Sequence, residues 1–328
     1  MVNDSRIRLG IIGLGVMGTE MLEVSHRHPE FDVVAAADPD AATVERIRAQ
    51  YPDLAVGPDP AALVEDERLT AIYIAAPPNT HASYAISAER RARRPWRAAP
   101  MNAGKAVFSE KPLAARLADG ADMVRVAAET GAVNALNFTL SDRAAAVAVT
   151  RAVHNGEAGE IVAVDMRFTF PEWPRAFQRD ARWVAGREQG GLLREVGSHF
   201  LFLTDRLLGP LTPAHTRIAY GAAAELSAHG LYTAGAVPVT ITGLVAAAPE
   251  TYEWILYGTK RSYRITDWSC LEVSTGAAWQ EHALDDPRGT EHTRLTAFAA
   301  AIRGEASTLA DFAAGLRVQE AVEHFHRA

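Results

Sequence analysis

The first third of the chain alternates between short apolar runs and amphipathic stretches. A mostly apolar run at 8–12 leads through a glycine-rich stretch at 13–18 into a helical pattern that ends near residue 28, and a second apolar run follows at 32–37. Short apolar runs favour buried strands, whereas apolar residues spaced three and four apart favour helices. The order therefore predicts a βαβ unit, which needs a parallel sheet covered on both faces.

The same alternation continues to residue 138. Further elements are predicted as helices at 41–50, after Pro60 and at 117–130, and as strands near 54–56 and at 71–76, 106–109 and 132–138. Repeated strands separated by helices are typical of one parallel sheet. We therefore predict a first α/β domain over residues 1–138.

Beyond residue 138, the regular alternation of strands and helices gives way to a region with mostly strands. Helices are expected at 141–154 and 192–208, and strands at 161–170, around Tyr220, and at 237–245, 252–257, 262–265 and 271–274, before two final helices. Closely spaced strands favour one open, largely antiparallel sheet. Residues 139–328 should thus form a second α/β domain.

Composition and charge narrow the class of protein. The chain has 328 residues, of which 48% are hydrophobic and 22% charged, as in ordinary globular proteins. A formal net charge of −7 opposes binding to nucleic acid or to an anionic membrane surface. The single cysteine, Cys270, excludes an internal disulfide and a thiolate zinc cluster. With no signal peptide or membrane span in the pattern, we expect a cytoplasmic protein without a metal centre.

A glycine-rich turn follows the first predicted strand and opens the first predicted helix. Residues 13–18 read GLGVMG and match the G-x-G-x-x-G pattern. Such glycines let the backbone approach a pyrophosphate, whose charge is favoured by the amides and the dipole at the helix N-terminus. In this context we predict a dinucleotide site rather than a purely structural turn. Its candidate cofactor-binding residues are Gly13, Gly15, Val16, Met17 and Gly18.

The end of the second strand indicates which dinucleotide is bound. Asp38 follows Gly18 at about the 20-residue spacing expected for a carboxylate on the adenosine ribose. Asp38 and Asp40 would repel a 2′-phosphate. NAD is therefore expected as the cofactor, in preference to NADP.

Two more turns follow predicted parallel strands and should lie at the same edge of the sheet, where ligands bind. The first reads APPNTH at 76–81, and the second reads SEKPL at 109–113. Their candidate cofactor-binding residues are Pro77, Asn79, His81, Glu110 and Lys111. Helix capping by Asn79 and a surface position for His81 are equally compatible with the spacing. Lys111 is either a solvated lysine or a group that exchanges a proton with a substrate hydroxyl.

A second glycine-rich turn enters a helix in the second domain. Residues 190–199 read GGLLREVGSH, and Glu195 and His199 stand four residues apart. On one helical face, the carboxylate could orient or charge the imidazole, which is the arrangement that proton transfer needs. An ordinary pair on a helix surface satisfies the same spacing.

Taken together, these segments resemble the Gfo/Idh/MocA oxidoreductase family, which includes glucose-fructose oxidoreductase and inositol dehydrogenase. The most specific marks are the glycine turn at 13–18, PNTH at 78–81, GKAVFSEKPLA at 104–114, and the residues Gly190, Gly191, Gly197, Ser198 and His199. The resemblance covers nearly the whole chain. It implies an N-terminal Rossmann domain, doubly wound on a parallel sheet, and a substrate-binding α/β domain. The open sheet of that second domain often forms the oligomer interface, so a homodimer or homotetramer is expected.

The resemblance also implies roles for particular residues. Lys111 corresponds to a catalytic lysine and His199 to its proton-transfer partner, with Glu195 nearby as a third catalytic candidate. The implied reaction moves a hydride between nicotinamide and a carbinol carbon of a sugar, a polyol or a related small hydroxylated compound. Alternatives within reach of the same fold are an NAD-dependent glycosidase or lyase that uses transient oxidation, and a non-catalytic NAD-binding regulator.

Two features depart from the family pattern. Polyol-oxidising members usually carry aspartate where this chain has Glu195, so the carboxylate either contacts the substrate or only supports His199. An arginine-rich segment at 89–100 interrupts the helix that should lead to the strand at 106. We interpret it as a solvated insertion, with an anion or partner site as the alternative.

Overall fold

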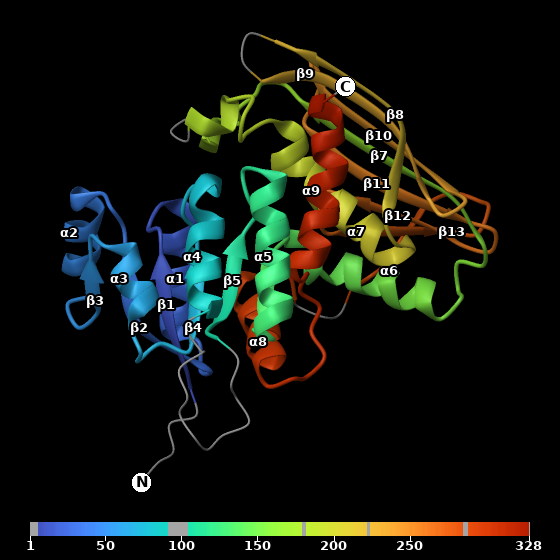
Figure 1. The fold of residues 1–328 in the computed structure, drawn as a ribbon. Helices are drawn as coiled ribbons and strands as arrows, with labels where there is room; N and C mark the ends of the chain where they lie inside the picture. The colour runs from blue at the N-terminus through green and yellow to red at the C-terminus, as the bar shows by residue number, and fades with distance from the viewer. Residues whose placement is uncertain (1–5, 91–103, 179–181, 222–223, 285–287, 328) are drawn as a thin grey trace. The chain divides into compact units, whose positions relative to one another are not determined.

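A computed structural model describes residues 6–90, 104–178, 182–221, 224–284 and 288–327 (Figure 1). The chain packs as two compact units. Unit 1 holds the described residues up to Phe138 together with Thr290–Leu316, and unit 2 holds Thr139–Gly289 and the residues from Arg317 onward. The expected boundary after residue 138 marks the end of the first stretch of unit 1. The return of the chain to unit 1 at Thr290 is a feature that the hydrophobic pattern did not reveal.

Unit 1 is built on a six-stranded parallel sheet in the order β3-β2-β1-β4-β5-β6. The strands are β1 (Ile7–Ile12), β2 (Phe31–Ala37), β3 (Ala55–Gly57), β4 (Ala71–Ile74), β5 (Ala106–Glu110) and β6 (Asn134–Asn137). The helices between them are α1 (Val16–Arg27), α2 (Ala41–Gln50), α3 (Pro60–Glu65), α4 (Pro78–Arg90) and α5 (Leu117–Thr130). This alternation confirms the doubly wound Rossmann fold expected for the first domain.

The strand order reverses next to β1, which pairs with β2 on one side and with β4 on the other. In open α/β sheets, ligands bind at such a switch point, beyond the carboxyl ends of the strands. The turns after β1 and β4 flank this point. The glycine turn at 13–18 and the turn at 75–77 therefore lie where a dinucleotide is expected.

A helix from late in the chain completes the core of unit 1. The helix α8 (Glu291–Ile302) begins with a capping box between Thr290 and Thr293, each of which bonds the backbone of the other. Its Phe298 is fully buried, with ring centroids 6.4 Å from Phe31 and 5.1 Å from Phe108. Those partners lie on β2 and β5, so α8 covers the central sheet of unit 1.

Unit 2 contains an eight-stranded sheet in the order β14-β13-β12-β11-β7-β10-β9-β8. The strands are β7 (Ile161–Phe170), β8 (Leu211–Tyr220), β9 (Glu225–Ala234), β10 (Val237–Val245), β11 (Thr251–Gly258), β12 (Ser262–Thr266), β13 (Cys270–Ser274) and β14 (Gln280–Glu281). Only β7 and β10 pair in parallel, and the other neighbours are antiparallel. The largely antiparallel sheet predicted from the sequence is thus confirmed, although β8 and β9 are ten-residue strands where only one strand near Tyr220 was expected.

The remaining elements of unit 2 are mostly helical. They are α6 (Ala144–His154), α7 (Ser198–Leu208), the 3₁₀ turns η2 (Thr139–Ser141), η3 (Ala176–Gln178) and η4 (Arg182–Ala185), and the π-helical turn η5 (Leu193–Gly197). The last helix, α9 (Phe312–Arg327), belongs to unit 1 up to Leu316 and to unit 2 from Arg317 onward. The single helix predicted at 192–208 is therefore a π-helical turn followed by α7.

The arginine-rich segment predicted at 89–100 lies outside the described residues from position 91 onward. The helix before it, α4, ends at Arg90. No helix in the described ranges is long and apolar enough to cross a bilayer.

Candidate active site

The three glycines of the 13–18 turn meet three different steric demands. Gly13 has φ +87, and a Cβ there would lie 2.6 Å from the carbonyl oxygen of Ala75. A Cβ on Gly18 would lie 1.8 Å from the carbonyl oxygen of Gly13, whereas a Cβ on Gly15 would meet nothing within 4 Å. The first glycine shapes the turn, the third allows the helix to pack closely, and the middle one leaves the backbone open to a ligand.

The start of α1 has the features of an anion site. Gly15 is the N-cap residue, and no side chain of the described residues caps this helix. The first-turn N–H groups of a helix lack partners within the helix and, with the dipole, favour a negative group such as a pyrophosphate. Val16 is 80% exposed and Met17 39% exposed, although both are apolar. The residues present therefore fit a dinucleotide, because an open backbone and exposed apolar side chains surround an uncapped helix end.

Asp38 fixes the glycine turn from the end of β2. One carboxylate oxygen accepts the N–H of Leu14 at 2.7 Å, and the other accepts the N–H of Asp40 at 2.9 Å. From the other side, Arg46 and Thr19 donate to the carbonyl oxygen of Leu14, at 3.2 and 2.8 Å. Each carboxylate oxygen has two lone pairs, so these bonds leave Asp38 able to accept ribose hydroxyls as well. The tie between Asp38 and Leu14 was not predicted from the sequence.

His81 joins the turn after β4 to the turn after β5. It is fully buried, with Nδ1 2.9 Å from the carbonyl oxygen of Pro112 and Nε2 2.8 Å from that of Ala76. It is therefore not the surface histidine that one interpretation of the sequence allowed. Burial lowers the pKa of His81, so the ring is neutral at pH 7 and donates to one of the two carbonyls. Its contacts are those of a residue that positions both turns.

Pro77 and Asn79 lie on the first of these turns. Both are exposed at the point where α4 begins. The backbone N–H and the hydroxyl of Thr80 both bond the carbonyl oxygen of Pro77, at 2.9 and 2.8 Å. Hydrogen bonds from Thr80 to Pro77 and from His81 to Ala76 thus hold this turn, while the side chains of Pro77 and Asn79 are exposed.

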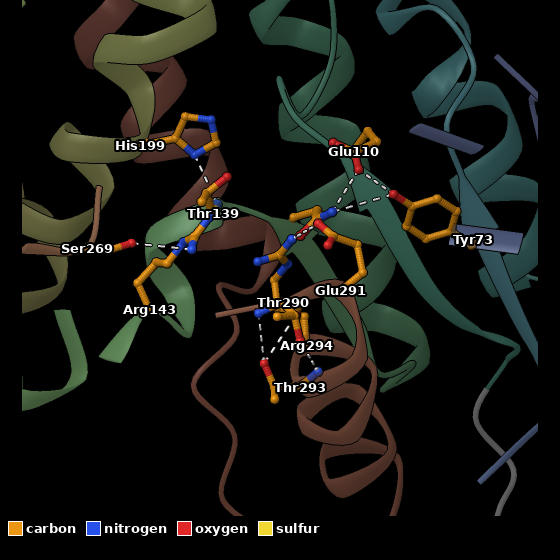
Figure 2. Close-up of polar contacts among 11 residues, drawn as sticks. Tyr73, Glu110, Thr139, Arg143, His199, Ser269, Thr290, Glu291, Thr293 and Arg294 are labelled. Atoms are coloured by element: carbon orange, nitrogen blue, oxygen red, sulfur yellow. Dashed lines mark hydrogen bonds and ion pairs between the residues drawn. The ribbon is translucent and has the colours of Figure 1, made fainter. Parts of the chain in front are cut away.

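Both chain neighbours of Lys111 are held by hydrogen bonds. The carboxylate of Glu110 accepts a hydrogen bond from the hydroxyl of Tyr73 (Figure 2). It also accepts one from the side-chain amide of Asn137 at 2.7 Å. On the other side, the carbonyl of Pro112 is bound by His81. Residues of the adjacent strands β4, β5 and β6 therefore fix the chain next to Lys111. Lys111 itself is half-buried and directly follows β5 at the carboxyl edge of the sheet.

Burial also changes the acidity of the groups beside Lys111. It raises the pKa of Glu110 above its ordinary value, although the bonds from Tyr73 and Asn137 and the charge of Lys111 oppose the change. The pKa of Tyr73 is raised for the same reason, with the Glu110 carboxylate adding to the effect. Tyr73 therefore stays protonated and serves as a hydrogen-bond donor to Glu110.

In unit 2, the backbone sets the tautomer of His199. The N–H of Thr139 donates to Nδ1 of His199 at 3.0 Å (Figure 2). Because Nδ1 accepts this bond, the proton of the neutral ring is on Nε2, which is then a donor. Nδ1 cannot at the same time donate to Glu195. At Nδ1, the partner of the imidazole is thus the peptide N–H of Thr139.

Glu195 has a different partner. It is buried in η5, and one of its carboxylate oxygens accepts a bond from the side-chain amide of Gln178 at 3.0 Å. Gln178 accepts from Arg175 at 2.9 Å, and Arg175 donates to the hydroxyl of Tyr252 at 3.2 Å. This chain of bonds links the π-helical turn to η3 and β11. Single π-helical turns within helices are frequent at functional sites.

A buried polar cluster supports the glycine turn that precedes η5. The carboxylate of Glu225, only 3% exposed, accepts the N–H of Leu192 at 2.6 Å. Gly191 has φ +104, and a Cβ there would lie 2.0 Å from this carboxylate. Arg194 makes a two-bond pair with Glu323, at 2.6 and 2.8 Å. The turn is therefore fixed by groups from β9 and α9.

Sequence reasoning proposed the glycines, Asp38, Lys111, Glu195 and His199 as site residues, and the structure places each of them near the end of a strand or the start of a helix. It missed residues that act through others: Tyr73, Asn137, Gln178, Arg175 and Glu225. These lie far along the chain from the groups they bind. No local periodicity connects them.

Comparisons with known proteins now bear on the whole chain. The family described as "Oxidoreductase family, NAD-binding Rossmann fold" matches residues 7–138, and the "GFO/IDH/MocA C-terminal domain" matches residues 146–264. The chain belongs to the Gfo/Idh/MocA oxidoreductase family. The resemblance drawn from the sequence motifs is thereby confirmed.

Several curated relatives are named as enzymes that act on sugars or polyols. A dTDP-3,4-didehydro-2,6-dideoxy-α-D-glucose 3-reductase of Streptomyces violaceoruber is 36% identical over 148 residues, which are 45% of this chain and 39% of that protein. An enzyme of the same name from Streptomyces antibioticus is 29% identical over 206 residues, 62% of this chain and 58% of its own. These matches thus span between about two fifths and three fifths of the relatives' lengths. An inositol 2-dehydrogenase of Acidothermus cellulolyticus is 31% identical over 115 residues, 35% of this chain and 30% of the relative.

Solved structures share the fold over nearly the full chain. The WlbA dehydrogenase from Bordetella pertussis, in complex with NADH and UDP-GlcNAcA, has a TM-score of 0.81 at 20% identity and covers 100% of this chain and 96% of its own. A 3-ketoreductase from Actinomadura kijaniata, in complex with TDP-benzene and NADP, has a TM-score of 0.76 at 19% identity, with 98% and 97% covered. One of these two structures contains NADH and the other NADP, so the shared fold accommodates either cofactor.

Proposed function

We propose that this protein is an NAD-dependent oxidoreductase that interconverts a carbinol and a carbonyl on a sugar, a polyol or a related small hydroxylated compound. The observation that carries the proposal is that the chain is fixed on both sides of Lys111, at Glu110 by Tyr73 and Asn137 and at Pro112 by His81. A solvated surface lysine needs no such support. Membership of an oxidoreductase family and the sugar and polyol relatives support the same reaction.

The cofactor is assigned to the glycine turn. The open backbone at Gly15 and the uncapped start of α1 hold the pyrophosphate, and Asp38 accepts the hydroxyls of the adenosine ribose. Pro77, Asn79 and Glu110 line the adjoining edge of the sheet, with His81 positioning that edge from beneath. When bound, the nicotinamide supplies the hydride chemistry.

Lys111 moves the proton. As an amine it takes the proton of the substrate hydroxyl during oxidation, and as an ammonium it returns a proton to the oxygen during reduction. His199 has a different task, because its Nδ1 accepts the Thr139 N–H and its proton is on Nε2. We assign it a hydrogen bond from Nε2–H to the reacting oxygen, which stabilises the charge that develops there. Glu195, bound to Gln178, either supports this helix turn or contacts a substrate hydroxyl.

The preference for NAD rests on the charges at the end of β2. Asp40 caps α2 by accepting from the backbone N–H of Thr43 at 2.8 Å and from its hydroxyl at 2.7 Å. These bonds lower the pKa of Asp40, so it is anionic at pH 7 beside Asp38. Two carboxyl groups at this point disfavour the 2′-phosphate of NADP. We place the enzyme in the cytoplasm as a homodimer or homotetramer formed through the sheet of unit 2.

The test is the appearance of NADH by absorbance with a panel of polyols, aldoses and glycosides, run in parallel with NADP. Lys111→Met should lower kcat by about 10²- to 10⁴-fold, the usual contribution of a general acid or base, while the Kd for NAD stays within about twofold. Retained turnover in this variant would move the proton role to another group. Release of a free sugar without NADH accumulation would indicate the transient-oxidation alternative, and tighter binding of NADPH than NADH would overturn the cofactor preference.

A further inference from the structure

The guanidinium of Arg175 lies against two aromatic rings just before η3. Its central carbon is 4.7 Å from the ring centroid of Phe177 and 5.6 Å from that of Trp173. Phe177 is 72% exposed, although phenylalanine is among the residues most often buried. An aromatic face attracts a cation at this distance and holds its plane. Arg175 and Phe177 therefore form one open surface of unit 2.

Two hydrogen bonds fix the same guanidinium. Nε of Arg175 donates to the side-chain oxygen of Gln178 at 2.9 Å, and one Nη atom donates to the hydroxyl of Tyr252 at 3.2 Å. A guanidinium has five N–H donors, so these two bonds leave three, two of them on the second Nη atom. In the described part of the chain, Arg175 makes no other hydrogen bond and no ion pair.

Two carboxylates approach Arg175 through these bonds, each with a neutral side chain between. The amide of Gln178 donates to Glu195 at 3.0 Å, and the hydroxyl of Tyr252 donates to Glu250. Among the described residues, neither acid pairs directly with the guanidinium. The positive charge of Arg175 is therefore held in a fixed place without a direct counter-charge from the described chain.

The same contacts join Arg175 to the residues proposed for chemistry. Gln178 leads to Glu195, which stands four residues before His199. On the other side, the ring centroid of Tyr252 is 5.0 Å from that of Trp268, which is 5.3 Å from that of His199. Two side chains thus separate the guanidinium from the imidazole on either route, and all of them belong to unit 2. A charged substituent on a sugar whose reacting oxygen lies at His199 is within reach of Arg175.

A fixed guanidinium with free N–H groups is suited to one class of ligand. Carboxylate and phosphate oxygens accept parallel N–H bonds from arginine, a geometry that a single hydroxyl does not match. The bonds to Gln178 and Tyr252 do not require a charged donor, so the charge is left for a ligand. Because the chain has a net charge of −7, it repels anions at long range, and an anionic ligand needs a local cation of this kind.

We propose that Arg175 is a substrate-binding residue that takes a carboxylate or phosphate group of the substrate. The inference rests on the proposed function, since the anion is assigned to the same molecule whose carbinol or carbonyl reacts. Such a group has two sources, an acidic sugar and a phosphorylated or nucleotide-linked sugar. Both present oxygen atoms that accept the free N–H groups of Arg175.

Two variants of Arg175 and one control separate its charge from its structural bonds. Arg175→Gln keeps an amide donor and removes the charge, whereas Arg175→Lys keeps the charge and loses the planar fork. The control is Arg264→Gln. Arg264 also lies over an aromatic ring, 4.9 Å from the centroid of Trp279, but it already makes a two-bond pair with Glu272 at 2.7 Å each. Urea unfolding checks that the variants fold, and Arg175→Lys decides the matter if Arg175→Gln does not.

The primary measurement is calorimetric titration with D-glucose, D-glucuronate, D-glucose 1-phosphate and dTDP-D-glucose, with and without NAD. At least one anionic compound should bind about tenfold or more tightly than D-glucose. Arg175→Gln should raise its Kd about 10- to 100-fold, the usual effect of losing hydrogen bonds to a charged group, and Arg175→Lys about 5- to 20-fold. The Kd in Arg264→Gln should stay within about twofold of wild type. Preferential binding of D-glucuronate would assign an acidic sugar, and preferential binding of either phosphorylated compound would assign the other source.

Two results of this titration would overturn the proposal. The first is that no anionic compound binds more tightly than D-glucose. The second is an equal change of Kd in Arg175→Gln and Arg264→Gln, or no change in either. A rise of the Kd for NAD by tenfold or more in Arg175→Gln would place the guanidinium on the cofactor and would likewise contradict a role in substrate binding.

Turnover separates this inference from the proposed function. Where an anionic compound is oxidised in the NADH assay, Arg175→Gln should raise its KM about 10- to 100-fold and leave kcat within about threefold. A purely structural role, acting through Gln178 and Glu195, would lower kcat instead. Binding that depends on Arg175 without NADH formation from any compound would count against the proposed function alone. NADH formation from neutral polyols only, unchanged in Arg175→Gln, would support the proposed function and overturn the role of Arg175.

Discussion

Glu225 and His326 lie together in the buried cluster of unit 2 and have opposite responses to pH. Their closest polar atoms are 3.5 Å apart. Burial raises the pKa of Glu225 to about 7, since the charged carboxylate is poorly solvated there. Burial, reinforced by the charge of Arg194, lowers the pKa of His326 to about 4. Both groups are therefore neutral in the folded protein near pH 5.5.

These displaced pKa values have opposite consequences for stability. Glu225 holds a proton in the folded state that the unfolded chain loses, so its stabilisation is complete below about pH 4.5 and disappears as the pH rises through about 7. His326 resists a proton that the unfolded chain takes up, so its stabilisation is present above about pH 6.5 and disappears as the pH falls through about 4. Each contribution is about 3 kcal/mol, so in wild type the two nearly cancel over this range.

Replacing Glu225 or His326 alone should therefore reveal a pH dependence of the free energy of unfolding that the other residue cancels in wild type. Glu225→Gln keeps an acceptor for the Leu192 N–H, and its free energy of unfolding relative to wild type should rise as the pH goes from 4.5 to 7. His326→Gln should show the opposite slope relative to wild type. Urea unfolding at pH 4.5, 5.5, 6.5 and 7 measures both differences. Parallel curves for the two variants would contradict the assignment of these protonation states.

Residues proposed to perform chemistry were easier to select from the sequence than the residues that bind them. Lys111 stands in a motif next to a strand, and Glu195 and His199 show the spacing of one helical face, so local sequence was enough to select them. The partner of His199 is the peptide N–H of Thr139, 60 positions earlier. A backbone donor has no side-chain signature, and its pairing is decided by how the unit folds.

At the scale of elements, the glycine turn and α1 offer a test of cofactor binding that leaves the fold intact. Gly15 has φ −67 and ψ −159, which alanine adopts readily, and an added Cβ meets no protein atom within 4 Å. Gly15→Ala should thus change the free energy of unfolding by less than about 1 kcal/mol. Its methyl group occupies the approach to the backbone, so the Kd for NAD should rise about tenfold or more.

The matched control is Gly221→Ala in unit 2, where a Cβ would meet only an ordinary contact at 3.8 Å. Calorimetric titration with NAD and urea unfolding compare the two variants. Equal NAD affinity in Gly15→Ala and Gly221→Ala would place the dinucleotide elsewhere. A third variant, Gly18→Ala, should destabilise the unit, because its Cβ would lie 1.8 Å from the carbonyl oxygen of Gly13.

Elements were predicted best where their hydrophobic pattern was strong. β7 and β10 have the predicted bounds, and the helix at 117–130 does as well. β8 was predicted only at its end, because its less exposed positions include Pro213 and Thr216 and the register shifts between Pro213 and His215, so the apolar alternation is interrupted. The π-helical turn η5 is invisible to periodicity, because one widened turn of five residues barely shifts the phase of the apolar positions that follow.

At the scale of the whole molecule, the core of unit 1 depends on a helix from the far end of the chain. Phe298→Ala should lower the free energy of unfolding of unit 1 by about 3–5 kcal/mol, the usual cost of removing a buried aromatic ring. Native-state hydrogen exchange should then accelerate most at the amides of β2 and β5, which carry Phe31 and Phe108. Phe325→Ala is the control, since Phe325 is equally buried but packs on Tyr232 of β9 in unit 2. Faster exchange in β9 than in β5 after Phe298→Ala would contradict the assignment of α8 to unit 1.

The change in the order of strands and helices at residue 138 predicted two units. No pattern in the sequence predicted that the chain returns to unit 1 at Thr290. The spacing of Leu295, Phe298 and Ala299 shows that α8 buries one face. It does not show which sheet that face covers. Two units of similar apolar character compete for such a helix, and only the shapes of the folded surfaces decide between them.

The late arrival of α8 has a consequence for how the protein is made. The ribosome adds roughly 150 residues between the end of β6 and α8, which takes about 8 to 30 seconds at ordinary elongation rates. During this time the aromatic side chains of β2 and β5 are not yet covered by α8. We expect chaperones to bind a nascent chain that exposes these aromatic side chains. We therefore expect NAD to bind only after α8 has been synthesised. Slowing translation between β6 and α8 should lengthen the period in which the chain is prone to aggregate.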